Sequence, residues 1–176
     1  MIKKSLLLFT LCCISFIGFS QTKNTSLSKS TLVKAAKEIM NSTTTCVLIT
    51  QDQNGTSSVR MMDPFPVEKD LIVWFGTNSS SRKVAQIKQN NLVTIYYRDK
   101  DDSGYVTLFG KAVLINSPIE KSNHWKETWK SFYKKNKENY ILIKVVPIWM
   151  EIVSPPRNII SSEETWEPPR VIFNPS

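Results

Sequence analysis

Apolar and polar residues alternate along six stretches of the chain in the pattern of half-buried strands. These stretches span residues 44–50, 56–62, 71–75, 92–97, 105–115 and 140–146. The sequence Asp52-Gln-Asn-Gly55 between the first two is typical of a tight turn and predicts a β-hairpin. Residues 28–40 differ, because their apolar side chains recur at helical spacing behind a run of Ser and Thr, which predicts an amphipathic helix.

Two further helices are expected where hydroxyl-bearing residues or proline begin a new pattern. One begins near Val84, after the Ser-rich segment that follows the third strand, and the other begins at Ser117-Pro118, after the fifth strand. Because helices do not alternate regularly with strands, parallel βαβ units are disfavoured. We therefore predict a mainly β fold of the α+β type: a six-stranded antiparallel Greek-key split barrel with flanking helices.

The chain is expected to consist of a leader, one domain and a tail. In residues 1–20, Lys3 and Lys4 precede an apolar stretch that ends in small residues, which is typical of a signal peptide cleaved before Gln21. Residues 21–153 hold the strands, and the Pro-rich residues 154–176 are expected to form an irregular tail that wraps the domain or a partner. We expect an exported protein, periplasmic or secreted, with no stable membrane anchor.

Charge and composition narrow the possible chemistry. The chain has 23 Lys and Arg, 15 Asp and Glu and one His, so its net charge is +8 and a multi-His metal centre is excluded. Once residues 1–20 are removed, the single cysteine is Cys46, for which a buried, unreactive thiol is expected. Trp125, Trp129 and Phe132 recur at helical spacing and are expected to pack against the barrel.

The densest functional pattern runs from residue 60 to residue 83. It comprises Arg60 at the end of the second strand, Thr77 after the third strand, and Ser81-Arg82-Lys83 at the start of a helix. Hydroxyls, cations and a helix N-terminus together can bind a phosphate group. The same residues would also suit an ordinary capped helix with solvated cations, and composition alone does not choose between these interpretations.

Residues 74–93 (WFGTNSSSRKVAQIKQNNLV) and residues 105–112 (YVTLFGKA) resemble the pyridoxamine 5′-phosphate oxidase-like superfamily of flavin-binding split barrels. The general stress protein branch is the most similar, and the resemblance covers residues 28–152. It implies a homodimer with FMN in a groove at the subunit interface. FAD and haem rank behind FMN as the expected cofactor.

The resemblance also assigns residues to the FMN site. At the phosphate end it implies contacts from Arg60, Ser81, Arg82 and Lys83. The residues implied to lie near the flavin ring, the ribityl chain or the partner's flavin are Met61, Met62, Trp74, Phe75, Thr77, Tyr105 and Trp149. No catalytic residue is assigned, because a flavin itself carries the electrons and the protein supplies anchoring and orientation.

Departures from the vitamin-making oxidases argue against pyridoxamine phosphate oxidation. Those enzymes carry a lysine where this chain has Phe65, and their C-terminal Arg-Leu-His-type segment is replaced by residues 155–158 (PPRN). We expect an exported FMN-binding protein, acting as an oxidoreductase or as a non-enzymatic binder or sensor of flavin, haem or another planar anionic ligand. A basic OB-type barrel that stacks nucleic acid on Tyr96, Tyr97 and Tyr105 is a third interpretation, and the dispersed charge argues against it.

Overall fold

The computed structural model describes residues 27–133 and 139–173, so the predicted signal peptide, residues 1–20, lies outside the described residues. The strands of this part of the chain are β1 (Cys46–Gln51), β2 (Ser57–Met62), β3 (Val73–Asn78), β4 (Leu92–Arg98), β5 (Tyr105–Ile115), β6 (Tyr140–Val153) and β7 (Arg170–Ile172). The α-helices are α1 (Lys29–Ser42), α2 (Arg82–Gln89) and α3 (Pro118–Asn123), and the short 3-10 helices include η1 (Lys69–Leu71), η2 (Glu127–Ser131) and η4 (Pro155–Arg157).

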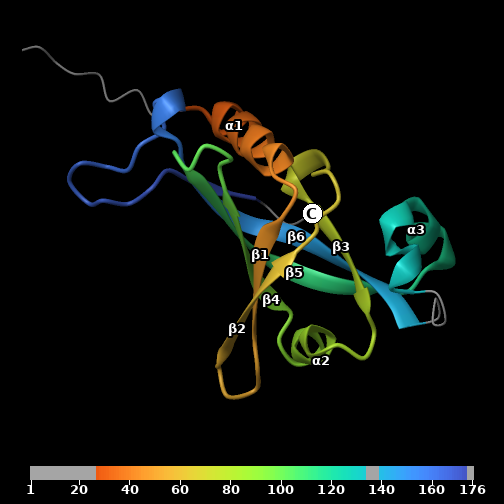
Figure 1. Ribbon diagram of the computed structural model, residues 1–176. Coiled ribbons are helices and arrows are strands. Elements are labelled where there is room, and N and C mark those ends of the chain that lie inside the picture. The colour runs from red at the N-terminus through yellow and green to blue at the C-terminus, as the bar shows by residue number, and fades with distance from the viewer. Residues whose placement is uncertain (1–26, 134–138, 174–176) are drawn as a thin grey trace, which may run out of the picture.

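The strands form one antiparallel sheet in the order β2-β1-β4-β5-β6-β3, and β7 pairs with a separate stretch of β6. The sheet curls into a half-barrel, with α1, α2 and α3 at separate places around it (Figure 1). The predicted split barrel of mainly β class is therefore confirmed. No helix in the described residues is long and apolar enough to cross a bilayer.

Two strand boundaries differ from the prediction for backbone reasons. The third strand begins at Val73 rather than at residue 71, because Asp70 and Leu71 adopt positive φ angles that a strand cannot contain. The sixth strand continues past Pro147 to Val153. Proline is tolerated there because the pairing of β5 with β6 shifts register next to it, so the missing N–H falls at an irregularity of the ladder.

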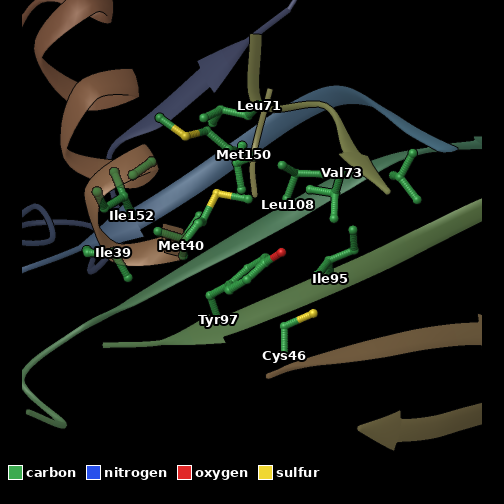
Figure 2. Close-up of a cluster of buried hydrophobic side chains, with 14 of the residues drawn as sticks. Ile39, Met40, Cys46, Leu71, Val73, Ile95, Tyr97, Leu108, Met150 and Ile152 are labelled. Atoms are coloured by element: carbon green, nitrogen blue, oxygen red, sulfur yellow. The ribbon is translucent and has the colours of Figure 1, made fainter. Parts of the chain in front are cut away.

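The inner face of the sheet carries the main core, and α1 covers it. Alternate residues of the strands point into this core, including Ile95, Leu108 and Met150, which are fully buried (Figure 2). Leu48 of β1 is fully buried in the same core. Each such side chain stabilises the fold by about 1.5 to 3 kcal/mol relative to exposure to water. The helix α1 begins at a proper cap, because the Ser28 hydroxyl accepts a hydrogen bond from the Thr31 N–H at 3.2 Å.

A second, smaller aromatic cluster lies on the outer face of β3, where the segment from α3 to η2 covers it. Trp129 packs so closely over Gly76 that a Cβ atom there would lie 2.4 Å from the indole. Trp125 and Trp129 therefore reach the barrel as expected. Phe132 does not, because the helix ends at Asn123 and the chain re-forms only as η2, which leaves this ring 82% exposed.

The C-terminal tail is more ordered than the irregular segment that we expected, and it wraps its own domain. Val171 and Phe173 are buried in the main core, and residues 170–172 add β7 to the sheet. Near the start of the tail, Arg157 donates hydrogen bonds to Asp99 Oδ2 and to Ser154 Oγ, both at 2.9 Å. Its Nε also lies 3.5 Å from a carboxylate oxygen of Glu38 in α1.

Cys46 is expected to be chemically inert in the folded protein. Its side chain is buried in the main core, and burial raises the pKa of the thiol to about 12. Because the thiolate is the nucleophile, iodoacetamide at pH 8 should leave Cys46 unmodified and should alkylate it after unfolding in guanidinium. Peptide mapping by mass spectrometry reads out this residue alone. Complete alkylation of the folded protein within minutes would contradict the assignment.

Candidate functional site

Arg60 is held at the inner face of β2 by a polar network. Its guanidinium donates to the Thr50 hydroxyl at 2.7 Å and to the Gln86 side-chain oxygen at 3.1 Å. Gln86 also accepts from Thr50 at 2.6 Å and donates through its amide nitrogen to Ser58 at 2.9 Å. Thr50 and Gln86 are both buried, so this network fixes Arg60 between β1 and α2.

Lys83, Thr77 and Ser81 meet where β3 leads into α2. The Lys83 ammonium donates to the Thr77 hydroxyl at 3.0 Å, and the Thr77 and Ser81 hydroxyl oxygens lie 3.3 Å apart. A tight turn brings them together, because the Asn78 carbonyl accepts from the Ser81 N–H at 3.0 Å and its side chain accepts from the Ser80 N–H at 2.8 Å. Thr77 is buried at this junction.

The first turn of α2 has no side-chain cap. Ser28 of α1 and Ser117 of α3 each accept a hydrogen bond from a backbone N–H of the helix they begin, whereas the Ser81 hydroxyl is turned toward Thr77. In addition, α2 begins with two cations, Arg82 and Lys83, at the end of the helix where the positive pole of the dipole disfavours them. An anion bound there would accept hydrogen bonds from the uncapped N–H groups and would offset the charge of the two cations.

The three cations of this junction repel one another. Burial and the charge of Arg60 lower the pKa of Lys83, and burial and the charge of Arg82 lower the pKa of Arg60. Within the described part of the chain, no ion pair joins Arg60, Arg82 or Lys83 to a carboxylate. The site therefore carries uncompensated positive charge that is suited to a polyanionic group such as a phosphate. We call Arg60, Arg82 and Lys83 the cation cluster.

The two aromatic residues assigned from β3 do not join the cation cluster through their side chains. Phe75 is buried in the main core on the inner face. Trp74 points to the outer face and lies under the α3–η2 segment, where its ring stacks on His124 with a centroid distance of 4.1 Å. Their assignment to the flavin ring stays a prediction, and any contact with a ligand would have to involve their backbone atoms.

The other assigned residues lie along β2, β5 and β6. Met62 packs against the main core, whereas Met61 points to the opposite face and is 64% exposed. Tyr105 stacks on Tyr96 with ring centroids 5.6 Å apart. Trp149 stacks on Phe109 at 5.3 Å.

Met61, Tyr105 and Trp149 lie on the face of the sheet opposite the main core, which we call the outer sheet face. Strand pairing aligns Val59, Ile49, Thr94, Phe109, Trp149 and Ile172 in one row across the sheet and Met61, Val47, Tyr96, Thr107, Glu151 and Arg170 in the next. Val59 and Ile172, at the two ends of the first row, are 64% and 65% exposed. The first row is apolar except for Thr94, whereas the second ends in the ion pair of Glu151 with Arg170. Exposed apolar side chains beside stacked aromatic rings are typical of an interaction surface.

Sequence analysis missed two residues that organise the site, Thr50 and Gln86. Thr50 stands in a predicted strand like any other β-branched residue, and only the position of α2 shows that its hydroxyl meets Arg60. The sequence could have indicated the role of Gln86. This residue lies between Val84 and Ile87 on the buried stripe of α2, where a polar side chain needs a hydrogen-bond partner.

A second candidate site, a cleft beside α3, carries less chemistry. The cleft of about 590 Å³ between α3 and η2 is lined by Lys121, Trp125, Tyr140 and neighbouring residues, and no member of the cation cluster lines it. In the described residues no group of three or more His, Cys, Asp or Glu side chains could hold a metal ion.

Comparison with known proteins finds one matching family model and several solved structures of similar fold. Residues 32–149 match the family described as "Pyridoxamine 5′-phosphate oxidase like". The fold is similar to General Stress Protein 26 from Bacillus anthracis, with a TM-score of 0.63 and 22% identity over 81% of this chain and 98% of that one.

Two further solved structures share the fold. A protein from Clostridium acetobutylicum related to general stress protein 26 has a TM-score of 0.61 and 20% identity over 73% of this chain and 91% of its own. A pyridoxamine 5′-phosphate oxidase-related, FMN-binding protein from Nostoc punctiforme has a TM-score of 0.58 and 14% identity over 85% of this chain and 99% of its own. No curated protein sequence matches. Since the family match spans more than half of the sequence, this chain belongs to the pyridoxamine 5′-phosphate oxidase-like family.

Proposed function

We propose that the protein binds FMN and that the cation cluster, Arg60, Arg82 and Lys83, holds its phosphate. The observation that supports this most strongly is the set of three adjacent cations without a carboxylate partner in the described structure, beside the uncapped first turn of α2. A phosphate dianion would accept hydrogen bonds from the guanidinium and ammonium groups and from the N–H groups of that turn. The Nostoc punctiforme relative, described as FMN-binding, agrees with this choice.

The remaining residues of the junction would orient the phosphate end. Thr77 and Ser81 offer hydroxyl groups next to the Lys83 ammonium, and Gln86 keeps the Arg60 side chain in place. A bound flavin supplies the redox chemistry, so the chain itself needs only to anchor and orient it. The lone imidazole, His124, is stacked on Trp74 and is poorly placed as an axial ligand, which disfavours haem.

We propose further that the protein acts as a homodimer that buries the outer sheet face. A second copy of the same face would cover the exposed Val59, Met61 and Ile172. It would also bring Tyr105 and Trp149 against the partner, where the family resemblance places residues that meet the flavin. Residues 1–20 support export of the chain, so FMN would be acquired after export.

The proposed phosphate contact is tested by comparing FMN with riboflavin, which has the same ring system and no phosphate. We expect the protein to bind FMN at least about tenfold more tightly than riboflavin, because the phosphate makes several charge-assisted hydrogen bonds that riboflavin lacks. Fluorescence titration of either flavin measures the affinity, and inorganic phosphate should compete with FMN. Equal affinity for the two flavins would rule out the cation cluster as the phosphate site.

A non-enzymatic flavin binder is the second candidate function, and Phe65 favours it. The vitamin-making oxidases carry a lysine at this position. Here the centroid of the Phe65 ring lies 5.1 Å from that of His124 and 5.4 Å from that of Trp129. The structure thus places an aromatic ring at this position, and a cation, Lys126, lies over that ring at 5.0 Å from its centroid and donates to the Pro64 carbonyl. Bleaching of the bound flavin by a reduced nicotinamide under anaerobic conditions separates an oxidoreductase from a binder.

A further inference from the structure

An ordered loop of the C-terminal tail presents a tryptophan to solvent. Residues 161–169, which we call the Trp166 loop, connect η4 with β7 and project away from the body of the domain as the blue loop in Figure 1. The Trp166 side chain in this loop is 81% exposed. Exposing so large an apolar group costs free energy, and tryptophan is enriched among the residues that dominate binding interfaces.

The backbone of the loop holds Trp166 in a fixed and unusual conformation. Its φ angle is +59°, a left-handed region that bulky residues rarely adopt. The Trp166 N–H donates to the Ser162 carbonyl and the Ser162 N–H donates to the Glu167 carbonyl, both at 2.9 Å. The Ser162 hydroxyl also accepts from the Glu164 and Thr165 N–H groups at 3.2 Å. Strained residues of this kind cluster at functional sites, which makes Trp166 a candidate for a functional residue.

The loop is acidic in a basic protein. Glu163, Glu164 and Glu167 surround Trp166, and in the described structure none of the three forms an ion pair. The chain as a whole carries a net charge of +8. The loop therefore combines an exposed aromatic side chain on a hydrogen-bonded backbone with a charge opposite in sign to the net charge of the chain.

The opposite end of the outer sheet face has the complementary properties. The loop adjoins β7, and strand pairing continues from β7 through β6, β5, β4 and β1 to β2. There Met61 is exposed on the outer sheet face, and the cation cluster lies beside it, with Arg60 on the inner face of the same edge strand; we call Met61 and the cation cluster together the β2–α2 end. In a two-fold dimer each patch contacts its complement on the other copy. A two-fold axis near the middle strands would place the Trp166 loop of one copy at the β2–α2 end of the other.

We propose that the Trp166 loop docks on the β2–α2 end of a second copy of this chain and completes the partner's flavin site. Trp166 packs against Met61 and the bound flavin, a type of contact that both sulfur and planar rings make favourably with an indole. The glutamates offset the positive charge that three cations retain around a phosphate dianion. This inference rests on the proposed FMN binding. The loop lies outside residues 32–149, the part of the chain that matches the family model.

Subunit mixing tests whether Trp166 acts on its own site or on its partner's. We expect Trp166→Ala to weaken FMN binding about tenfold, and Phe132→Ala, which removes an equally exposed ring elsewhere, to leave the affinity unchanged. The second variant is Arg82→Ala/Lys83→Met, which disables its own phosphate site. Heterodimers of Trp166→Ala with this double variant, isolated through two affinity tags, should recover one site of wild-type affinity per dimer.

The outcomes separate this inference from the proposed function. If the heterodimer gains no wild-type site, Trp166 acts within its own subunit and the inference is wrong. If Trp166→Ala binds FMN as the wild type does, the loop takes no part in the site, although FMN binding itself stands. If the wild-type protein binds no FMN, the proposed function fails and this inference fails with it.

Discussion

Replacing Arg157 with alanine is expected to lower the free energy of unfolding by about 2 to 4 kcal/mol. The substitution would leave the Asp99 carboxylate without its partner. The Asp99 side chain is only 3% exposed and pairs with the Arg157 guanidinium at 2.9 Å. Removing one partner of a buried ion pair leaves the other charge desolvated without compensation. The same guanidinium also approaches Glu38, so its loss disconnects α1, the β4–β5 turn and the tail. Urea denaturation followed by circular dichroism measures the change.

Two variants decide whether the buried charge is the cause. Adding Asp99→Asn to Arg157→Ala should recover part of the lost stability, because a neutral amide tolerates burial better than an unpaired carboxylate. Arg98→Ala is the matched control, since Arg98 pairs with Asp102 and both side chains are more than 60% exposed. Such a surface pair contributes less than about 1 kcal/mol. An equal loss of stability in Arg98→Ala and Arg157→Ala would show that burial of Asp99 is not what matters.

The regular part of the fold could be predicted because its signals are local. All six predicted strands exist, and the hairpin at Asp52 to Gly55 joins the first two as its turn sequence indicates. Alternation along a strand reports which face is buried, and that is sufficient to find strands in an antiparallel sheet. The run of Ser and Thr at the start of residues 28–40 likewise indicated the N-cap of α1, which the structure places at Ser28.

The features that sequence analysis missed depend on contacts between distant segments. Strand β7 has only three residues, and it forms because Val171 and Phe173 fill the main core, which no local pattern can indicate. The aromatic stripe that begins at Trp125 indicated one continuous helix. The structure instead has the 3-10 helix η2, in which Trp129 packs over Gly76.

The candidate site shows the same division between local and distant information. The run Ser81-Arg82-Lys83 is contiguous, so its proximity to Thr77 across a short turn followed from the sequence. By contrast, the sequence could not show which of Trp74 and Phe75 points inward. Adjacent residues of a strand point to opposite faces of the sheet, and both of these residues are apolar. Burial of Thr50 and Gln86 around Arg60 required the position of α2 against β1.

Arg82→Ala and Lys83→Met are each expected to weaken FMN binding by about 1.5 to 3 kcal/mol, which is the contribution of a hydrogen bond to a charged group and amounts to roughly 10- to 150-fold in affinity. Lys88→Ala is the matched control: this lysine lies in the last turn of the same helix, is exposed, and should not change the affinity. Equilibrium titration of FMN fluorescence measures all three. Unchanged affinity in Arg82→Ala and Lys83→Met would remove the basis of the proposed phosphate site.

Lys83 should destabilise the folded protein when no ligand is bound. Burial and Arg60 lower the pKa of Lys83, so the folded state disfavours its charged form relative to the unfolded chain, whose ordinary pKa is 10.5. This penalty is fully present below the lowered folded pKa and disappears as the pH rises through it toward 10.5, because only the unfolded chain then keeps the proton. Lys83→Met should therefore raise the unfolding free energy at pH 7, with a smaller gain near pH 10. Denaturation curves of the ligand-free proteins at both pH values measure this gain, and a loss of stability in the variant at pH 7 would mean that the Thr77 contact outweighs the repulsion.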